Sequence, residues 1–331
     1  MSVNANHLAG WMPIRIYWNG RTPAVDWCWV GARRFTDPFF DHTIDACLRL
    51  PFSLLVRPQT AMDSLRELSE IAPGLQPRGF IFHMSRCGST LVSQMLAALP
   101  ASVVLSEAGP IDSVLRAQFQ DPSLSDDRRV EWLRWVVSAL GQPRCDETNL
   151  FVKFDAWSAL ELPLIHRAYP DVPWIFLYRN PVEVLVSQAA KKGAHMIPGV
   201  VHPELFGMTL ADAFEMQPED YCARVLALAC EASLSHHQSH PGLMINYEQL
   251  PDAMWTGIAD FYGIELQASD MEAFRRLTTR DAKNPSLAFE NDSQAKQAAA
   301  STALRRAAEV WLAPLYERLE TARLGTPAGT K

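Results

Sequence analysis

The stretch that decides the fold is GFIFHMSRCGSTLVSQMLAAL, residues 79–99. Its first six residues form a short apolar run, typical of a buried strand, and the residues from Thr90 onward have the period of an apolar helix. A strand, a short turn of small residues and a helix start together aim backbone N–H groups at an anion, and the helix dipole adds attraction. Residues 85–90 therefore predict a phosphate or sulfate cradle, to which Arg86 adds a cation. The alternative is a helix N-terminus capped by Ser85 or Ser89, with no ligand.

The turn departs from the nucleotide-binding pattern G-x-x-x-x-G-K-[ST]. No Lys precedes the hydroxyls Ser89 and Thr90, and His83 stands where the first Gly would be. A nucleoside triphosphatase needs that Lys on the β- and γ-phosphates. The turn is thus interpreted as phosphate-binding but not triphosphate-cleaving.

The chain after this segment alternates between strand-like and helix-like patterns. The further apolar runs are ASVVLS (101–106), LFVKF (150–154), WIFLYR (174–179) and LMINY (243–247). Helical patterns lie between them: DRRVEWLRWVVSAL (127–140), PVEVLVSQAAKK (181–192) and YCARVLALACEASLSHHQ (221–238). Short apolar strands separated by helices are typical of a parallel sheet that is covered on both faces. We predict a three-layer, P-loop-type α/β fold whose parallel sheet has about five strands, with a small N-terminal addition.

Three regions are predicted along the chain. Residues 1–75 form the N-terminal addition, with short strands at 13–18 and 25–30 around an N-G-R-T-P turn and a helix at 62–71. Residues 76–265 form the core, and residues 266–331 form a C-terminal cap. The cap contains one predicted helix, ALRRAAEVWLAPLYERLE (303–320), and a frayed Gly/Thr/Pro tail.

Composition narrows the class of protein. The 331 residues carry 30 Lys and Arg against 37 Asp and Glu, a net charge of −7, which argues against a general nucleic-acid binder. No apolar run is long enough to span a membrane, and the first residues do not match a secretory signal. The six cysteines include no C-x-x-C pair, so we expect reduced thiols, no zinc site and a cytoplasmic protein.

A second candidate anion site follows the run at 174–179. Arg179 ends that run, at the carboxyl end of a predicted strand, where open α/β sheets bind ligands. Pro181 suits a first helical turn, and Ser187 follows eight residues after the Arg. If Arg179 and Ser187 converge, they can grip a separate phosphate. Taken alone, this segment is better interpreted as an Arg at a strand end and a Ser on a helix face.

The two segments together resemble the sulfotransferase family that uses 3′-phosphoadenosine 5′-phosphosulfate (PAPS). The family's loop P-K-S-G-T-T is similar to S-R-C-G-S-T at 85–90, and its R-[ND]-P motif with a Ser eight residues after the Arg is similar to Arg179-Asn180-Pro181 with Ser187. Tyr247-Glu248-Gln249-Leu250 is similar to the family's Y-E-D-L. The resemblance covers about residues 78–265. It implies that the 5′-phosphosulfate and the 3′-phosphate are bound by Ser85, Arg86, Cys87, Gly88, Ser89, Thr90, Arg179 and Ser187.

The resemblance is incomplete. Arg86 replaces a common Lys, Leu91 replaces an aromatic residue that stacks on adenine, and a late R-K-G-x-x-G motif is missing. The segment TTRDAKNPSL (278–287), with Arg280 and Lys283, is a candidate basic lid in its place. These departures indicate a divergent, bacterial-type member.

Sulfuryl transfer needs a general base and cations beside the loop. The resemblance implies that Lys153 faces the sulfuryl group, and Arg86 completes a cationic clamp. Glu107, after the second run, is the first candidate for the base. Asp155, which aligns with a family His, is the second, and another residue such as His195 stays open. No divalent metal is expected.

The expected reaction moves a sulfuryl group from PAPS to a hydroxyl, or an amine, of a small-molecule or peptide acceptor. The alternatives are a P-loop nucleotide kinase and a non-catalytic nucleotide-binding or assembly protein. A homo-oligomer is possible.

Overall fold

The computed structural model describes residue 8, residues 10–20 and residues 22–325. Its core is a sheet of five parallel strands in the order β5-β6-β4-β7-β8. The strands are β4 (Pro77–His83), β5 (Ser102–Ser106), β6 (Asn149–Lys153), β7 (Trp174–Tyr178) and β8 (Leu243–Asn246). The predicted three-layer α/β fold with about five parallel strands is confirmed.

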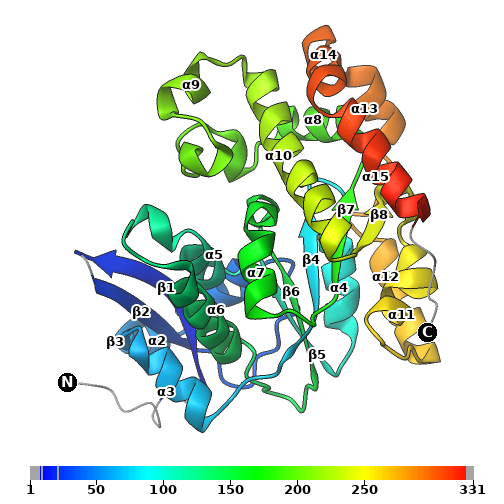
Figure 1. The fold of residues 1–331 in the computed structure, drawn as a ribbon. Coiled ribbons are helices and arrows are strands. Elements are labelled where there is room, and N and C mark those ends of the chain that lie inside the picture. Colours follow the sequence, from blue (N-terminus) through cyan, green and yellow to red (C-terminus); the bar gives the residue numbers. More distant parts are fainter. Residues whose placement is uncertain (1–7, 9, 21, 326–331) are drawn as a thin grey trace.

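Helices cover both faces of this sheet (Figure 1). To the right of the sheet in this view lie α4 (Ser89–Ala98) and α12 (Ala268–Thr278), and to its left lie α6 (Asp126–Leu140) and α7 (Leu162–Ala168). The strands between them are buried over almost their whole length, which explains their near-continuous apolar sequence. Further helices are α5 (Gly109–Leu115), α8 (Pro181–Ala190), α9 (Leu210–Glu215), α10 (Pro218–Ser239), α11 (Ala259–Phe261) and α13 (Ser293–Ala299).

The N-terminal residues form a separate antiparallel sheet. Its strands are β1 (Trp11–Asn19), β2 (Thr22–Trp29) and β3 (Gln59–Ala61), and its helices are α1 (Phe40–Leu48), α2 (Pro51–Leu55) and α3 (Asp63–Ile71). The hairpin predicted around the N-G-R-T-P turn is present, with Asn19 paired to Thr22. The sheet lies beside α5 and α6 (Figure 1), and Trp27, fully buried, donates from its indole N–H to Thr60 Oγ1 at 2.9 Å. The division of the chain into three regions stays a prediction.

The expectation of one helix at 303–320 is wrong. The structure has two helices there, α14 (Thr302–Trp311) and α15 (Ala313–Gly325), which are separated at Leu312. Pro314 explains the break, because it has no N–H to donate to the carbonyl of Val310 and its ring would clash in a continuous helix. The tail expected to fray, residues 326–331, lies outside the described residues.

Two further expectations concern the whole chain. In the described ranges, no helix is both long and apolar enough to cross a membrane. All six cysteines are described and are free thiols, in agreement with the prediction.

Candidate functional site

The predicted anion loop joins β4 to α4 through a strained turn. Ser85 and Arg86 have φ of 73° and 53°, and Gly88 has φ of 85°. The left-handed region costs a non-glycine residue of order 1–3 kcal/mol, so such conformations concentrate at functional sites. Gly88 is needed at its position, since a Cβ there would lie 2.5 Å from Leu250 Cδ1. The turn brings the chain directly into the first residues of α4, Ser89 and Thr90.

Two of the predicted loop residues anchor the turn with their side chains. The Cys87 thiol, fully buried, donates to the carbonyl of Leu177 at 3.1 Å, and burial raises its pKa to about 12. The Ser85 hydroxyl accepts from Gln188 Nε2 at 2.9 Å, and the Ser85 N–H donates to His83 Nδ1 at 3.0 Å. The Cys87 thiol therefore points into the core, and Gln188 of α8 holds the Ser85 hydroxyl in place.

Residues 86–90 of the loop line a cavity of about 660 Å³. Arg179 and Ser187 line the same cavity, so the structure brings the two predicted anion sites together. Tyr247 and Leu250, from the third matching segment, also line it. Further parts of its wall come from α4, α8 and the segment after β8, at residues 91, 186, 190, 248 and 251, and from the C-terminal cap, at residues 278, 280–283, 289–293 and 296.

Arg179 already has acidic partners in this cavity. Its Nε lies 2.6 Å from Glu183 Oε2, and its Nη2 lies 3.0 Å from both Asp292 Oδ1 and Ser293 Oγ. The guanidinium also stacks over the Tyr247 ring, 3.9 Å from the centroid. Burial alone would lower the pKa of Arg179, but the hydrogen bond to Asp292 and the charge of Glu183 outweigh it and raise the pKa. The arginine is thus preorganised, with Asp292 on the face that lines the cavity.

Ser187 lies on α8, beside the anion loop rather than on Arg179. Its side chain is 6% exposed, and its carbonyl accepts from Arg86 Nη2 at 3.4 Å. Within the described residues, no hydrogen bond joins Ser187 to Arg179. Both residues line the cavity instead.

The ends of β5 and β6 place a buried ion pair between Lys153 and Glu107 near the loop. Lys153, the last residue of β6, pairs with Ser106 of β5, so Glu107 follows directly beside it and its N–H donates to the Lys153 carbonyl at 2.8 Å. Lys153 is fully buried, and its ammonium forms an ion pair with Glu107. Glu107 has φ of 55°, a third strained residue of this site.

His83 supports Glu107 from the other side. Because His83 Nδ1 accepts the Ser85 N–H, its ring proton is on Nε2, which lies 3.5 Å from Glu107 Oε1. Burial would raise the pKa of Glu107, but the Lys153 ammonium and His83 hold it well below its usual range. Glu107 is therefore ionised.

Asp155 lies two residues beyond Lys153, and its pKa is shifted in the opposite direction to that of Glu107. Burial and the nearby carboxylates Glu107 and Asp112 raise its pKa well above the usual value, so it keeps its proton to a higher pH than an ordinary Asp. The two candidate bases are thus coupled neighbours with pKa values pushed apart. Such pairs are typical of acid–base centres.

His195 approaches the same centre from the segment after α8. Its ring is 95% buried, it lies 5.2 Å from the Trp157 ring, and neither ring nitrogen has a hydrogen-bond partner within the described part of the chain. Burial, with His83 nearby, lowers the pKa of His195 to about 4, against the opposing effect of Glu107. It is a neutral imidazole with both nitrogens available.

Sequence reasoning missed two residues of this site. These are Asp292, which accepts a hydrogen bond from Arg179, and Phe39, whose ring lies beside the Lys153 ammonium. No local pattern marks either one, because each reaches the site from a distant part of the chain.

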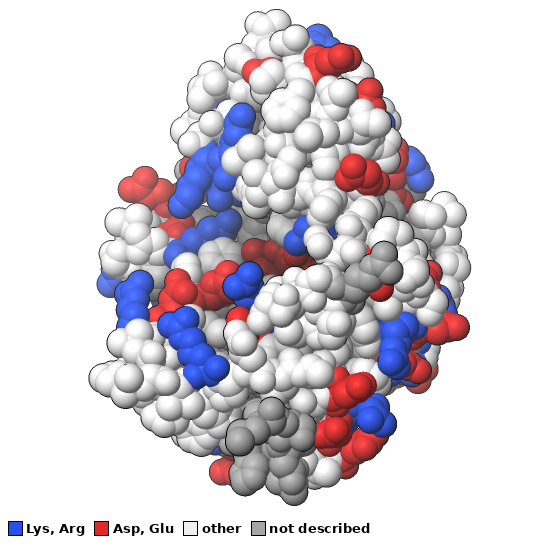
Figure 2. Space-filling model, turned by 90° about the vertical axis from the view of Figure 1, so that its left-hand side faces the viewer, with Lys and Arg blue, Asp and Glu red and all other residues white. Residues whose placement is uncertain are grey.

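The molecular surface has a hollow on the side that lies at the left of Figure 1 and faces the viewer in Figure 2. Figure 2 shows acidic side chains within this hollow and basic side chains beside it. A concave, charged region of this kind suits a polar ligand.

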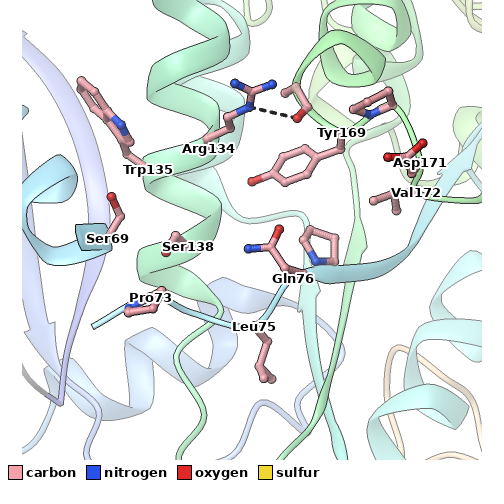
Figure 3. A pocket seen from close by; sticks show the side chains of 13 residues that line it. Ser69, Pro73, Leu75, Gln76, Arg134, Trp135, Ser138, Tyr169, Asp171 and Val172 are labelled. Atoms are coloured by element: carbon pink, nitrogen blue, oxygen red, sulfur yellow. Dashed lines mark hydrogen bonds between the residues drawn. The ribbon is translucent and has the colours of Figure 1, made fainter. Parts of the chain in front are cut away.

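A second cavity, of about 530 Å³, lies at the opposite end of the sheet, near the start of β4 (Figure 3). Arg134 borders it, but its Nε donates to the Ala168 carbonyl at 3.0 Å. None of the predicted site residues lines this cavity.

Comparison with known proteins gives likenesses in structure only. No family model matches the chain, and no curated protein sequence matches it. The sulfotransferase domain of an olefin synthase from Synechococcus is 17% identical and covers 78% of this chain and 98% of its own, with a TM-score of 0.41. A sulfotransferase from Alicyclobacillus acidocaldarius is 16% identical over 76% of this chain and 97% of its own (TM-score 0.42). One from Mycobacterium avium is 11% identical over 73% and 78% (TM-score 0.43). At these identities the likeness concerns the fold alone.

Proposed function

We propose that the protein transfers a sulfuryl group from PAPS to a hydroxyl of an acceptor. The observation that supports this most is that the loop 86–90 and Arg179 with Ser187 line one cavity. PAPS carries anionic groups at two ends of one nucleotide, a 3′-phosphate and a 5′-phosphosulfate. A cavity with an anion loop at one place and a preorganised arginine at another fits that distribution of charge.

The residues at the strand ends supply the chemistry. The acceptor oxygen forms a bond to sulfur while the bond from sulfur to the 5′-phosphate oxygen breaks, and the electron pair stays on that oxygen. Arg86 and Lys153 stabilise the charge that develops there. Glu107 receives the acceptor proton, which a positioned base makes about 10²- to 10⁴-fold faster.

The pairing of Lys153 with Glu107 links binding to activation of the base. Without nucleotide, Lys153 lowers the pKa of Glu107 and makes it a weak base. A sulfuryl group beside Lys153 competes for the ammonium, which weakens this pairing and raises the pKa of Glu107. Asp155, whose pKa is raised, holds its proton to a higher pH than an ordinary Asp and can act as a hydrogen-bond donor while it does.

Calorimetric titration with adenosine 3′,5′-bisphosphate tests the nucleotide site without knowledge of the acceptor. We expect Arg179→Ala to bind the bisphosphate at least tenfold more weakly than the wild type does. The wild type should bind adenosine 5′-monophosphate, which lacks the 3′-phosphate, at least tenfold more weakly than it binds the bisphosphate. Turnover of radiolabelled PAPS with a pool of hydroxyl acceptors tests the reaction.

Each alternative has its own result. Preference for ATP with Mg²⁺ and ATP-dependent phosphorylation would replace the proposal with a nucleotide kinase. Tight bisphosphate binding without transfer to any acceptor in the pool would favour a binding protein.

A further inference from the structure

Lys283 is a cation of the cavity wall whose ammonium has no anionic partner. It lies in the segment between α12 and α13, where Arg280 bridges to Ala288, and it lines the cavity together with Arg86. Its backbone N–H donates to Asp281 Oδ1 at 3.0 Å, which fixes the turn that carries it. Within the described residues, no ion pair or hydrogen bond of its ammonium is present. The residue is exposed and lines the cavity without an ion-pair partner among the described residues.

Phe39 places this ammonium beside the catalytic lysine. The Lys283 Nζ lies 5.9 Å from the centroid of the Phe39 ring, and the Lys153 Nζ lies 5.2 Å from the same centroid. An aromatic face attracts cations at such distances. Phe39 immediately precedes α1, so it belongs to the N-terminal part of the chain and not to the sheet that carries the anion loop.

Charges of both signs lie near Lys283. Lys153 is paired with Glu107, and the cavity wall holds the cations Arg86 and Lys283 as well as the carboxylates Asp281, Glu290 and Asp292. Burial, with Arg86 and Lys153 nearby, lowers the pKa of Lys283 to about 8, while Glu107 and Cys87 oppose this. An anion bound between these cations would relieve their mutual repulsion and favour the charged form of Lys283.

We propose that Lys283 is a third cation of the transfer site, which contacts the sulfuryl end of the nucleotide with Arg86 and Lys153, and that Phe39 is the positioning residue that holds the two lysines. This inference rests on the proposed function. The sharing of one ring with Lys153 assigns Lys283 to the sulfuryl end of the cavity rather than to the 3′-phosphate end at Arg179. It also gives the N-terminal region a role, since that region completes the site.

Transfer kinetics form the first arm of the test. We expect Lys283→Gln to lower the single-turnover rate with PAPS about 100-fold, in the range found when one donor to a developing charge is removed. Its affinity for adenosine 3′,5′-bisphosphate, which lacks the sulfuryl group, should change less than threefold. Lys283→Arg should recover most of the rate. Phe39→Leu should lower the rate about tenfold and bisphosphate binding little.

Arg276→Gln is the matched control, because it removes an exposed cation of the neighbouring helix α12 that does not line the cavity. An unchanged rate in Lys283→Gln, or an equal loss of rate and of bisphosphate affinity, would overturn the assignment to the transfer site.

Sulfate binding forms the second arm and does not depend on PAPS. Sulfate should raise the melting temperature of the wild-type protein, less so for Lys283→Gln, and the effect should weaken as the pH rises past about 8, where Lys283 loses its proton. Arg86, Lys153, Glu107 and Cys87 also act on the Lys283 ammonium, but Lys283→Arg should remove the weakening above pH 8. If sulfate stabilises the protein through Lys283 but the protein does not use PAPS, the proposed function is wrong and the anion site stands. Sulfate stabilisation indifferent to Lys283 would refute the site itself.

Discussion

If Arg179 binds the 3′-phosphate as we propose, that phosphate meets the carboxylate of Asp292, so Asp292→Asn should tighten nucleotide binding. Its Oδ1 is 3.0 Å from Arg179 Nη2. A phosphate oxygen on the same guanidinium would lie roughly 4 Å from this carboxylate, where two unit charges repel by about 1 kcal/mol in water and about 4 kcal/mol near a protein surface. The Asp292 side chain is 46% exposed, so solvent keeps the repulsion near the lower end. A gain of about 1.4 kcal/mol corresponds to tenfold tighter binding.

Calorimetry with two ligands measures this effect. Adenosine 3′,5′-bisphosphate should bind Asp292→Asn about tenfold more tightly than it binds the wild type, whereas adenosine 5′-monophosphate should show little difference. Glu70→Gln, which removes one exposed negative charge from α3, controls for net charge. Weaker binding of the bisphosphate to Asp292→Asn would refute the reasoning, because it would mean that Asp292 orders Arg179 for the nucleotide instead of competing with it.

Three further predictions concern the reaction centre and its stability. Glu107→Gln should lower turnover about 10²- to 10⁴-fold, whereas Asp155→Asn, which resembles the protonated carboxyl, should lower it less than tenfold; the reverse order in a steady-state assay would make Asp155 the base. Lys153→Met should reduce kcat far more than bisphosphate affinity, and equal losses in the two measurements would make it a simple binding residue. His195 has a folded-state pKa of about 4, below its unfolded value, so the unfolded chain binds more protons and stability falls as the pH drops from about 6.5 toward 4. Urea unfolding at pH 7 and pH 5 should show a loss of about 2 kcal/mol through this residue that His195→Phe lacks, and an identical loss in that variant would exclude His195 as a source.

The sheet could be predicted because its physical signals are local. A strand buried on both faces must be apolar along its length, and a helix with one buried face must repeat with helical period. The anion loop follows from the same logic, since small residues between such a strand and helix leave backbone N–H groups free. The break at Leu312 was also within reach, because Pro314 interrupts an otherwise continuous pattern.

The partners of the site residues could not be predicted, because they depend on segments far apart in sequence. Phe39 precedes the anion loop by more than forty residues, and Asp292 follows Arg179 by more than one hundred. The opposite pKa shifts of Glu107 and Asp155 likewise depend on burial and on the place of the Lys153 ammonium. Sequence alone could name both carboxylates but could not rank their pKa values.

The strand order also gives the nucleotide a direction. The chain leaves β4 first toward the β6 and β5 side of the sheet and later toward the β7 and β8 side, so β4 is the point where the order reverses and a crevice opens at the strand ends. The anion loop follows β4 at this point. Arg179 lies at the end of β7, and Lys153 with Glu107 lies at the ends of β6 and β5. A nucleotide with its 3′-phosphate on Arg179 must therefore direct its 5′ end toward β6 and β5. Under the proposed function, the acceptor would approach from that side, which is also the side of Phe39 and the N-terminal sheet.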